Sequence, residues 1–269
     1  MTINLNDFES GKKYDGDYDA DLLALQARLA RIQVAHIIHG KSAIIAMEGW
    51  DAAGKGGAHS RLTASWDPRY FEVWPIAAPT EEERVRHFLW RFWKRLPGKG
   101  EINLFDRTWY GRVLVERVEG YCAEADWKRG YDEINEFESQ QRDNGVTLIK
   151  IFLHITQEEQ DERFRDRLES PWKRWKTGKD DYRNRARRAD YLKAYHDMFE
   201  RTNTRWAPWT VIDGNSKKAA RIAVLTAVAD QLEMAVDMKP LPADPAVVAL
   251  AEAALGSPIK LDQSDGDSD

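Results

Sequence analysis

A glycine-rich loop is the part of the chain best suited to chemistry. It follows a short apolar run, Ala43 to Met47, that predicts a buried strand, and it precedes a predicted helix. Its glycines allow successive backbone N–H groups to converge on phosphate oxygens, and Lys55 adds a positive charge. The alternative is a plain glycine turn with an exposed lysine. We predict a phosphate-binding loop of a phosphoryl-transfer enzyme, with backbone contacts from Gly49, Ala52, Ala53, Gly54, Gly56 and Gly57.

Two aspartates give this loop a predicted metal site. The pattern G-x-x-x-x-G-K is followed by Gly56, where a Ser or Thr usually holds magnesium. Asp51, inside the loop, is the candidate replacement, and its alternative role is a helix cap or an Asx turn. Asp106 follows the predicted strand Ile102 to Phe105, where a parallel sheet delivers side chains to a ligand. We therefore expect Mg²⁺ between the two carboxylates, with Arg107 either neutralising a transferred phosphoryl group or forming a surface ion pair.

The composition is that of an ordinary globular protein. The chain has 269 residues, 42% hydrophobic and 32% charged, and we expect one large α/β domain. No apolar stretch approaches the length that spans a bilayer, and no export signal is visible. Cys122 is the only cysteine, which excludes an internal disulfide or a cysteine metal cluster and fits a reducing compartment. We predict a cytoplasmic protein with no membrane partner.

Positive charge is concentrated in one segment. Residues 162–188 hold eleven Lys or Arg against five Asp or Glu, although the whole chain has a net charge of −5. A basic strip in an acidic protein predicts a local site for a multiply charged anion rather than a nucleic-acid surface. The alternative for any single charge is a solvated helix face.

Strand and helix patterns alternate along the chain. Strands are predicted at residues 43–47, 71–76, 102–105, 146–155 and 209–212. Between them lie helical patterns, including one from Val85 to Leu96, and the basic strip is expected to break near Pro171. This alternation predicts an α/β fold in three layers with a mostly parallel sheet. A Pro- and Ala-rich tail at 239–269 is expected to fray or to pack on a partner.

Several motifs resemble the polyphosphate kinase 2 family. They are Glu48 to Gly57, Ala78 to Thr80, Phe105 to Arg112 and Val115 to Val118, and the resemblance extends over about residues 15–235. It implies a thymidylate-kinase-like P-loop fold in residues 1–238, with a helical lid at about 160–190. It also implies Mg²⁺, inorganic polyphosphate as phosphoryl donor and a nucleotide as acceptor, in a homo-oligomer such as a dimer or tetramer.

The resemblance also implies roles for single residues. Asp51, Lys55, Asp106 and Arg107 become the catalytic set, and the same two aspartates become the metal ligands. Further phosphate or nucleotide contacts fall on Arg61, Arg112 and Glu116. The basic strip becomes a lid that grips polyphosphate through Arg163, Arg167, Lys173, Arg174 and Lys176.

The acceptor is less sharply implied. The motifs look most like the branch that phosphorylates AMP, but that branch commonly has two tandem copies of the domain and this sequence shows one. AMP, ADP or both therefore stay open, and the reaction is expected to be reversible. An ATP-dependent small-molecule kinase and a non-catalytic polyanion-binding protein are the alternatives. The two retained aspartates disfavour the second, because carboxylates repel a polyanion unless metal is present.

Overall fold

A five-stranded parallel sheet forms the centre of the protein. The structure, a computed structural model, describes residues 3–261. The strand order is β2-β3-β1-β4-β5, and every neighbouring pair is parallel. The central strand β1 is buried along its whole length, as its unbroken apolar run requires. The predicted parallel α/β fold is confirmed, with strands β1 (Ala43–Gly49), β2 (Phe71–Pro75), β3 (Ile102–Asp106), β4 (Thr147–His154) and β5 (Trp209–Asp213).

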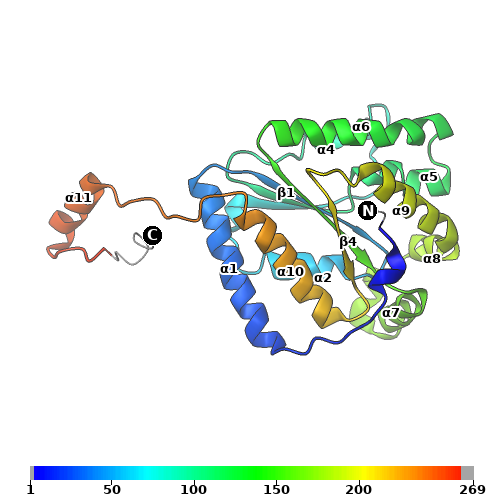
Figure 1. Ribbon diagram of the computed structural model, residues 1–269, viewed down its shortest axis with the longest axis horizontal. Coiled ribbons are helices and arrows are strands. Elements are labelled where there is room, and N and C mark those ends of the chain that lie inside the picture. The colour runs from blue at the N-terminus through cyan, green and yellow to red at the C-terminus, as the bar shows by residue number, and fades with distance from the viewer. Residues whose placement is uncertain (1–2, 262–269) are drawn as a thin grey trace.

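Helices cover both faces of the sheet and complete the three layers (Figure 1). One face carries α1 (Tyr18–Ile38), α2 (Lys55–Leu62) and α10 (Lys217–Glu233), which contact one another. The other carries α5 (Val115–Glu119), α6 (Glu124–Asp143) and α9 (Arg188–Thr202). Shorter elements are α3 (Glu81–Arg84), α4 (Trp90–Trp93) and the 3₁₀ turns η1 (Leu5–Phe8), η2 (Pro68–Tyr70) and η3 (Trp109–Arg112).

The prediction of a single helix from Val85 to Leu96 is wrong. Helix α3 ends at Arg84, just before this region, only the short helix α4 lies within it, and Val85 is 82% exposed. Thr80 and Glu83 form a capping box that starts α3. The Glu83 carboxylate also forms ion pairs with Arg91 and Arg95 beyond the break. The chain therefore folds back on Glu83 instead of continuing as one amphipathic helix.

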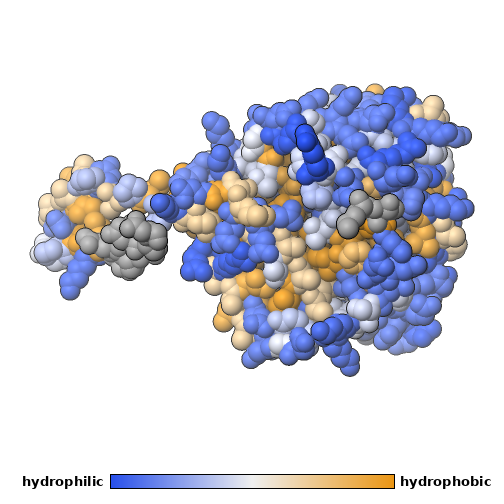
Figure 2. Space-filling view, in the orientation of Figure 1, coloured by the Kyte–Doolittle hydropathy of each residue, from blue (hydrophilic) through white to orange (hydrophobic). Residues whose placement is uncertain are grey.

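The basic strip forms a helical segment at one end of the sheet. It comprises α7 (Gln157–Glu169), the 3₁₀ turn η4 (Pro171–Lys176) and α8 (Lys179–Ala186), with the expected break at Pro171. Figure 2 shows mainly hydrophilic residues over this part of the surface. We call residues 157–186 the lid.

The tail contains a helix that the sequence pattern did not indicate. It is α11 (Pro245–Leu255), which lies away from the body of the molecule in Figure 1. Figure 2 shows hydrophobic residues on its surface, and Val247, Leu250 and Leu255 are exposed. The rest of the predicted tail, residues 262–269, lies outside the described residues.

Candidate active site

The loop between β1 and α2 has the backbone of an anion-binding nest. Ala52, with φ of 66°, and Gly54, with φ of 111°, both lie in the left-handed region, so nearby N–H groups turn toward a common side. Gly49, with φ of 138°, passes so close to β4 that a β-carbon there would lie 2.3 Å from the Leu153 carbonyl oxygen. A β-carbon at Gly56 would meet no atom within 4 Å. Glycine is therefore required at 49 for packing, whereas Gly56 leaves open space above the loop.

Lys55 lies beneath this nest. Its side chain is buried, and Nζ donates to the carbonyl oxygens of Gly49 at 2.9 Å and Trp50 at 3.1 Å. An ammonium group has three donors, so one remains for an anion bound in the loop.

Helix α7 holds the other side of the loop. Gln160 Nε2 donates to the Asp51 carbonyl oxygen at 3.0 Å, and Arg163 Nη1 donates to those of Ala52 at 3.0 Å and Ala53 at 2.9 Å. Arg163 Nη2 also donates to the Gly214 carbonyl oxygen at 2.6 Å. These bonds point three successive carbonyls away from the nest and leave its N–H groups facing the opposite way.

Arg163 braces the loop in the structure, and it also lines the hollow above the loop. It was expected to grip polyphosphate, but its side chain is 5% exposed and is used up by loop carbonyls and by an ion pair with Glu159. The sequence could not reveal this, because a count of charges does not separate a buried arginine from an exposed one.

Asp51 lies between an arginine and the lid. Its Oδ1 accepts from Arg107 Nη2 at 2.8 Å, and its Oδ2 accepts from Asn184 Nδ2 of α8 at 2.9 Å. Burial acts to raise the pKa of Asp51, but the charges of Arg107 and Lys55 and these hydrogen bonds outweigh it and lower that pKa. Asp51 therefore stays an anion at neutral pH.

Asp106 is the free carboxylate of the site. It ends β3 beside Met47 of β1, and its side chain makes no hydrogen bond or ion pair within residues 3–261. Asp106 and Asp51 both line the same hollow above the loop. Each carboxylate has about four lone-pair positions, of which Asp51 uses two in protein contacts. This pair of hard oxygen ligands fits Mg²⁺.

Buried Glu48 fixes the segment that carries Arg107. Its Oε1 accepts from the backbone N of Thr108 at 2.8 Å and from Thr108 Oγ1 at 2.7 Å, and burial raises its pKa. Arg107 has a φ of 65°, which is uncommon for a residue with a side chain. The Glu48 contact stabilises this turn directly after Asp106.

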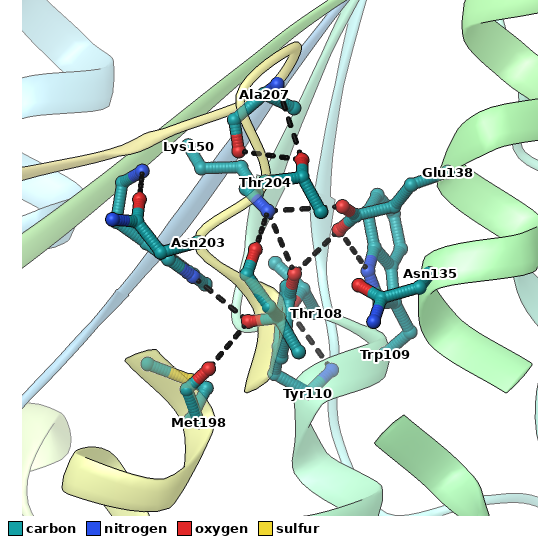
Figure 3. A network of polar contacts seen from close by, with 12 residues as sticks. Thr108, Trp109, Tyr110, Asn135, Glu138, Lys150, Met198, Asn203, Thr204 and Ala207 are labelled. Carbon is teal, nitrogen blue, oxygen red and sulfur yellow. Dashed lines mark hydrogen bonds and ion pairs between the residues drawn. The ribbon is translucent and has the colours of Figure 1, made fainter. Parts of the chain in front are cut away.

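A fully buried polar network anchors the next residues (Figure 3). The Glu138 carboxylate of α6 accepts from Trp109 Nε1 at 2.9 Å and Tyr110 Oη at 2.6 Å. It also pairs at 3.0 Å with Lys150 Nζ of β4, which donates in turn to the Thr202 carbonyl oxygen at 2.7 Å. Burial lowers the pKa of Lys150 and raises that of Tyr110. Because a buried charge that loses its partner is costly, the network keeps the 106–112 segment in one position.

Two hollows meet at the loop. The first is about 900 Å³ and is lined by apolar, aromatic and charged side chains, including Phe88, Arg112 and Tyr121. The second is about 710 Å³ and contains the glycine loop with a largely basic rim. Asp51 and Arg107 line both. A group transferred from one hollow to the other would pass these two side chains.

Most of the remaining predicted residues line one of the two hollows. Arg112 and Glu116 form an ion pair at 3.1 Å in the wall of the first. Arg167, Lys173 and Lys176 of the lid line the second. Two predicted residues line neither: Arg174 donates from Nε to the Leu168 carbonyl oxygen, and Arg61 donates to Gly57 and Tyr18.

Some polar residues of the site carry no signal in the sequence, among them Gln160, Asn184, Lys217 and Arg221. Asn184 touches Asp51, although the two lie far apart in sequence. No motif marks any of these residues, and only the folded chain brings them to the loop.

The sequence matches a known protein family over most of its length. Residues 12–240 match the model of the family described as Polyphosphate kinase 2 (PPK2). This chain belongs to the polyphosphate kinase 2 family. In the region that the structure describes, no helix combines the length and apolarity needed to cross a bilayer.

Individual members of the family are similar over most of the chain. The polyphosphate:AMP phosphotransferase of Pseudomonas syringae pv. tomato is 49% identical over 219 residues, which are 81% of this chain and 44% of that protein. The ADP-polyphosphate phosphotransferase 2 of Rhizobium meliloti is 41% identical over 206 residues, 77% of this chain and 67% of that protein. The chain spans about half the length of the AMP phosphotransferases that it matches.

A solved structure supports the same fold. The crystal structure of polyphosphate kinase 2 from Arthrobacter aurescens TC1 aligns with a TM-score of 0.84 at 36% identity, and it covers 95% of this chain and 92% of that one. The P-loop kinase fold predicted from the sequence is thereby confirmed.

Proposed function

We propose that this chain is a magnesium-dependent phosphotransferase that moves a phosphoryl group from inorganic polyphosphate to AMP, ADP or both. The observation that carries the proposal is that a basic, glycine-lined hollow and a partly aromatic hollow share Asp51 and Arg107. The basic, glycine-lined hollow suits a polyanion, and the partly aromatic hollow suits a nucleotide.

The reaction exchanges one phosphoanhydride for another. A phosphate oxygen of the nucleotide forms a bond to the terminal phosphorus of polyphosphate, and the P–O bond to the next unit breaks. The shortened chain leaves with the electron pair of that bond. The attacking oxygen is already ionised at neutral pH, so no general base is needed and positioning dominates. The exchange is nearly balanced in bond type, and we therefore propose that it is reversible.

The protein supplies positive charge and fixed donors. Lys55 and the loop N–H groups neutralise the phosphates of the donor, and Arg107 stabilises charge on the group in transit. Asp51 and Asp106 are the residues that would hold Mg²⁺. A bound magnesium ion neutralises phosphate oxygens and orients donor and acceptor.

The names of individual relatives support more than one nucleotide acceptor. Relatives of this chain are named polyphosphate:AMP, ADP-polyphosphate and NDP-polyphosphate phosphotransferases. The ion pair of Arg112 and Glu116 beside the Phe88 ring gives the nucleotide hollow both polar and apolar contacts. AMP and ADP are therefore both proposed as acceptors.

The deciding experiment offers each acceptor separately. The purified chain is incubated with Mg²⁺ and polyphosphate plus AMP or ADP, and the nucleotides are separated by chromatography. The proposal expects ADP from AMP or ATP from ADP. Product formed only when ATP replaces polyphosphate as donor would indicate an ATP-dependent kinase. Polyphosphate binding without magnesium and without turnover would indicate a polyanion-binding protein.

The homo-oligomer and the cytoplasmic location remain predictions from the resemblance and the composition. Light scattering on the eluting peak of a sizing column tests the first, and fractionation of cells tests the second.

A further inference from the structure

Helix α11 is encoded by clear start and stop signals but buries none of its residues. Asp244 Oδ1 accepts from the backbone N of Ala246 at 2.8 Å at the start of the helix, and Gly256, with a φ of 68°, ends it. None of its 11 residues is buried within the part of the chain that the structure describes. An isolated helix shorter than about 12 residues is marginal in water, so α11 needs a surface to pack on.

One side of α11 is entirely apolar. Val247, Leu250 and Ala254 are exposed, and their spacing places them on the same side of the helix. Glu252 is the only charged side chain of α11, and it makes no ion pair within residues 3–261. Its Oε1 accepts from the backbone N of Ile259 at 2.9 Å, which engages one of the two carboxylate oxygens. The helix therefore offers a partner one apolar row and one carboxylate.

Helix α1 presents a matching row to solvent. Exposed residues at spacings of three or four follow its outer side: Leu23, Ala27, Arg31 and Val34. Leu23 is 69% exposed and Val34 is 53% exposed. Arg31 has no ion pair or hydrogen bond with any side chain that the structure describes. Each row thus carries one charge, and the two charges have opposite signs, which is the kind of complementarity that fixes register between two surfaces.

The spacer before α11 directs it away from α1 of the same chain. His39 Nε2 hydrogen-bonds the Lys239 carbonyl oxygen at 3.1 Å, which fixes the chain at the end of α1. Residues 240–244 then lead to α11, with prolines at 240 and 242 and no glycine anywhere in residues 215–255. Proline-rich spacers are extended and semi-rigid, at about 3.1 Å per residue, and a tight reversal most readily uses glycine. In Figure 1 the spacer leaves the body beside α1, and α11 lies clear of it.

We propose that α11 of one copy of the chain packs on the outer side of α1 of a second copy, and that the exchange is reciprocal. Glu252 of each copy then pairs with Arg31 of the other, and the apolar row of α11 covers that of α1. A two-fold axis makes the two contacts identical, which is the commonest arrangement in homodimers. Because α11 lies beyond residues 12–240 that match the family, this contact is additional to the common fold and separate from phosphoryl transfer.

A membrane surface is the other ligand that an exposed apolar helix suits. Helices that lie in a membrane interface usually carry Lys or Arg on their polar side, and α11 carries neither. The opposite charges of Glu252 and Arg31 favour a second copy instead.

Sedimentation velocity over a range of protein concentrations measures association of the full chain. The wild type is expected to dimerise. Leu250→Asp and Leu23→Asp, both at exposed positions, are each expected to raise the dimer Kd at least about tenfold, because a carboxylate enters an apolar contact. Leu192→Asp on α9, where the leucine is 40% exposed, is the matched control and keeps the wild-type Kd. A monomeric wild type, an unchanged Kd in Leu250→Asp, or equal dissociation of the control would overturn the contact.

Charge reversal tests the pairing itself. Arg31→Glu and Glu252→Arg are each expected to raise the dimer Kd about fivefold, and both changes in one chain are expected to restore it. Failure of the double variant to recover would overturn the proposed register.

Mixing two variants separates exchange between copies from folding back within one chain. Leu250→Asp keeps its α1 surface and Leu23→Asp keeps its α11, so the mixture retains one intact contact and is expected to associate more tightly than either variant alone. No gain on mixing would overturn the exchange. Co-sedimentation of the wild type, but not of Leu250→Asp, with vesicles of phosphatidylcholine and phosphatidylglycerol would assign α11 to a membrane surface and overturn the second copy as its partner.

Discussion

Asn184 of the lid donates a hydrogen bond from Nδ2 to Asp51 Oδ2 at 2.9 Å, across 133 positions of sequence. The same side chain accepts from Tyr191 Oη at 3.1 Å, so α9 fixes its orientation. Arg107 takes the other oxygen of Asp51. The lid is therefore connected to the carboxylate inside the phosphate loop, and a change in lid position would be felt at Asp51.

Replacing Asn184 by Ala is expected to slow polyphosphate-dependent turnover about tenfold, which corresponds to one lost hydrogen bond to a charged group. Stability should change little, because Asn184 is only half-buried. Steady-state kinetics and a thermal melt measure the two effects. Asn135→Ala is the matched control, since it removes a similar bond to the Arg201 carbonyl oxygen far along α6. Wild-type kcat in Asn184→Ala would show that the lid contact does not serve the reaction.

Asp106→Asn tests the predicted metal ligand. The change keeps the shape of the side chain and removes a charge with no described partner, so the Tm should stay the same or rise slightly. The kcat is expected to fall by at least about 10²-fold, because stabilisation of phosphate charge is lost. Loss of a metal ligand should weaken Mg²⁺ binding, so half-maximal activity should need a higher Mg²⁺ concentration in Asp106→Asn than in the control Asp132→Asn. Asp132 is an exposed α6 position. Unaltered turnover and magnesium dependence would remove Asp106 from the site.

Arg163→Gln probes the bracing of the loop by α7. Loss of the guanidinium leaves the Ala52, Ala53 and Gly214 carbonyls without their donor and leaves Glu159 unpaired, at a cost of about 3–5 kcal/mol. The Tm and kcat/KM for polyphosphate are both expected to fall.

Two comparisons separate loop positioning from simple destabilisation. Arg163→Lys restores the charge but not the fork of donors, so it should recover stability more than kcat/KM. Arg165→Gln, exposed on the same helix and without a described bond, should behave like the wild type. Full recovery of kcat/KM by lysine would contradict a positioning role.

The parts predicted well from the sequence are those with local signals. Strand β1 follows from a continuous apolar run, the other strands follow from short, largely apolar segments, and the loop follows from glycine spacing after β1. The failed helix at 85–96 had the right apolar spacing, but the contacts of Glu83 with Arg91 and Arg95 overrode it. Arg163 and Asn184 carry no local signal at all, since their roles depend on which loop atoms the folded lid reaches.

His154 is expected to make stability depend on pH. Its Nδ1 accepts from Trp50 Nε1 at 2.9 Å, which leaves Nε2–H to donate to Glu9 Oε1 at 2.9 Å. Burial lowers the pKa of His154 and Arg188 acts in the same direction, while Glu9 and Asp213 oppose them. The native ring is thus neutral, because a proton on Nδ1 would face the Trp50 N–H.

The sign of the pH effect follows from this lowered pKa. In the unfolded chain His154 titrates near its ordinary pKa of about 6.5, and in the folded protein it titrates lower. Between these two values the unfolded state binds more protons, so the free energy of unfolding falls as the pH drops below about 6.5. Melts from about pH 7.5 to about pH 5.5 should show the Tm advantage of wild type over His154→Gln shrinking as acid is added. An advantage that stays constant over this range would mean that the His154 proton does not distinguish the folded from the unfolded chain.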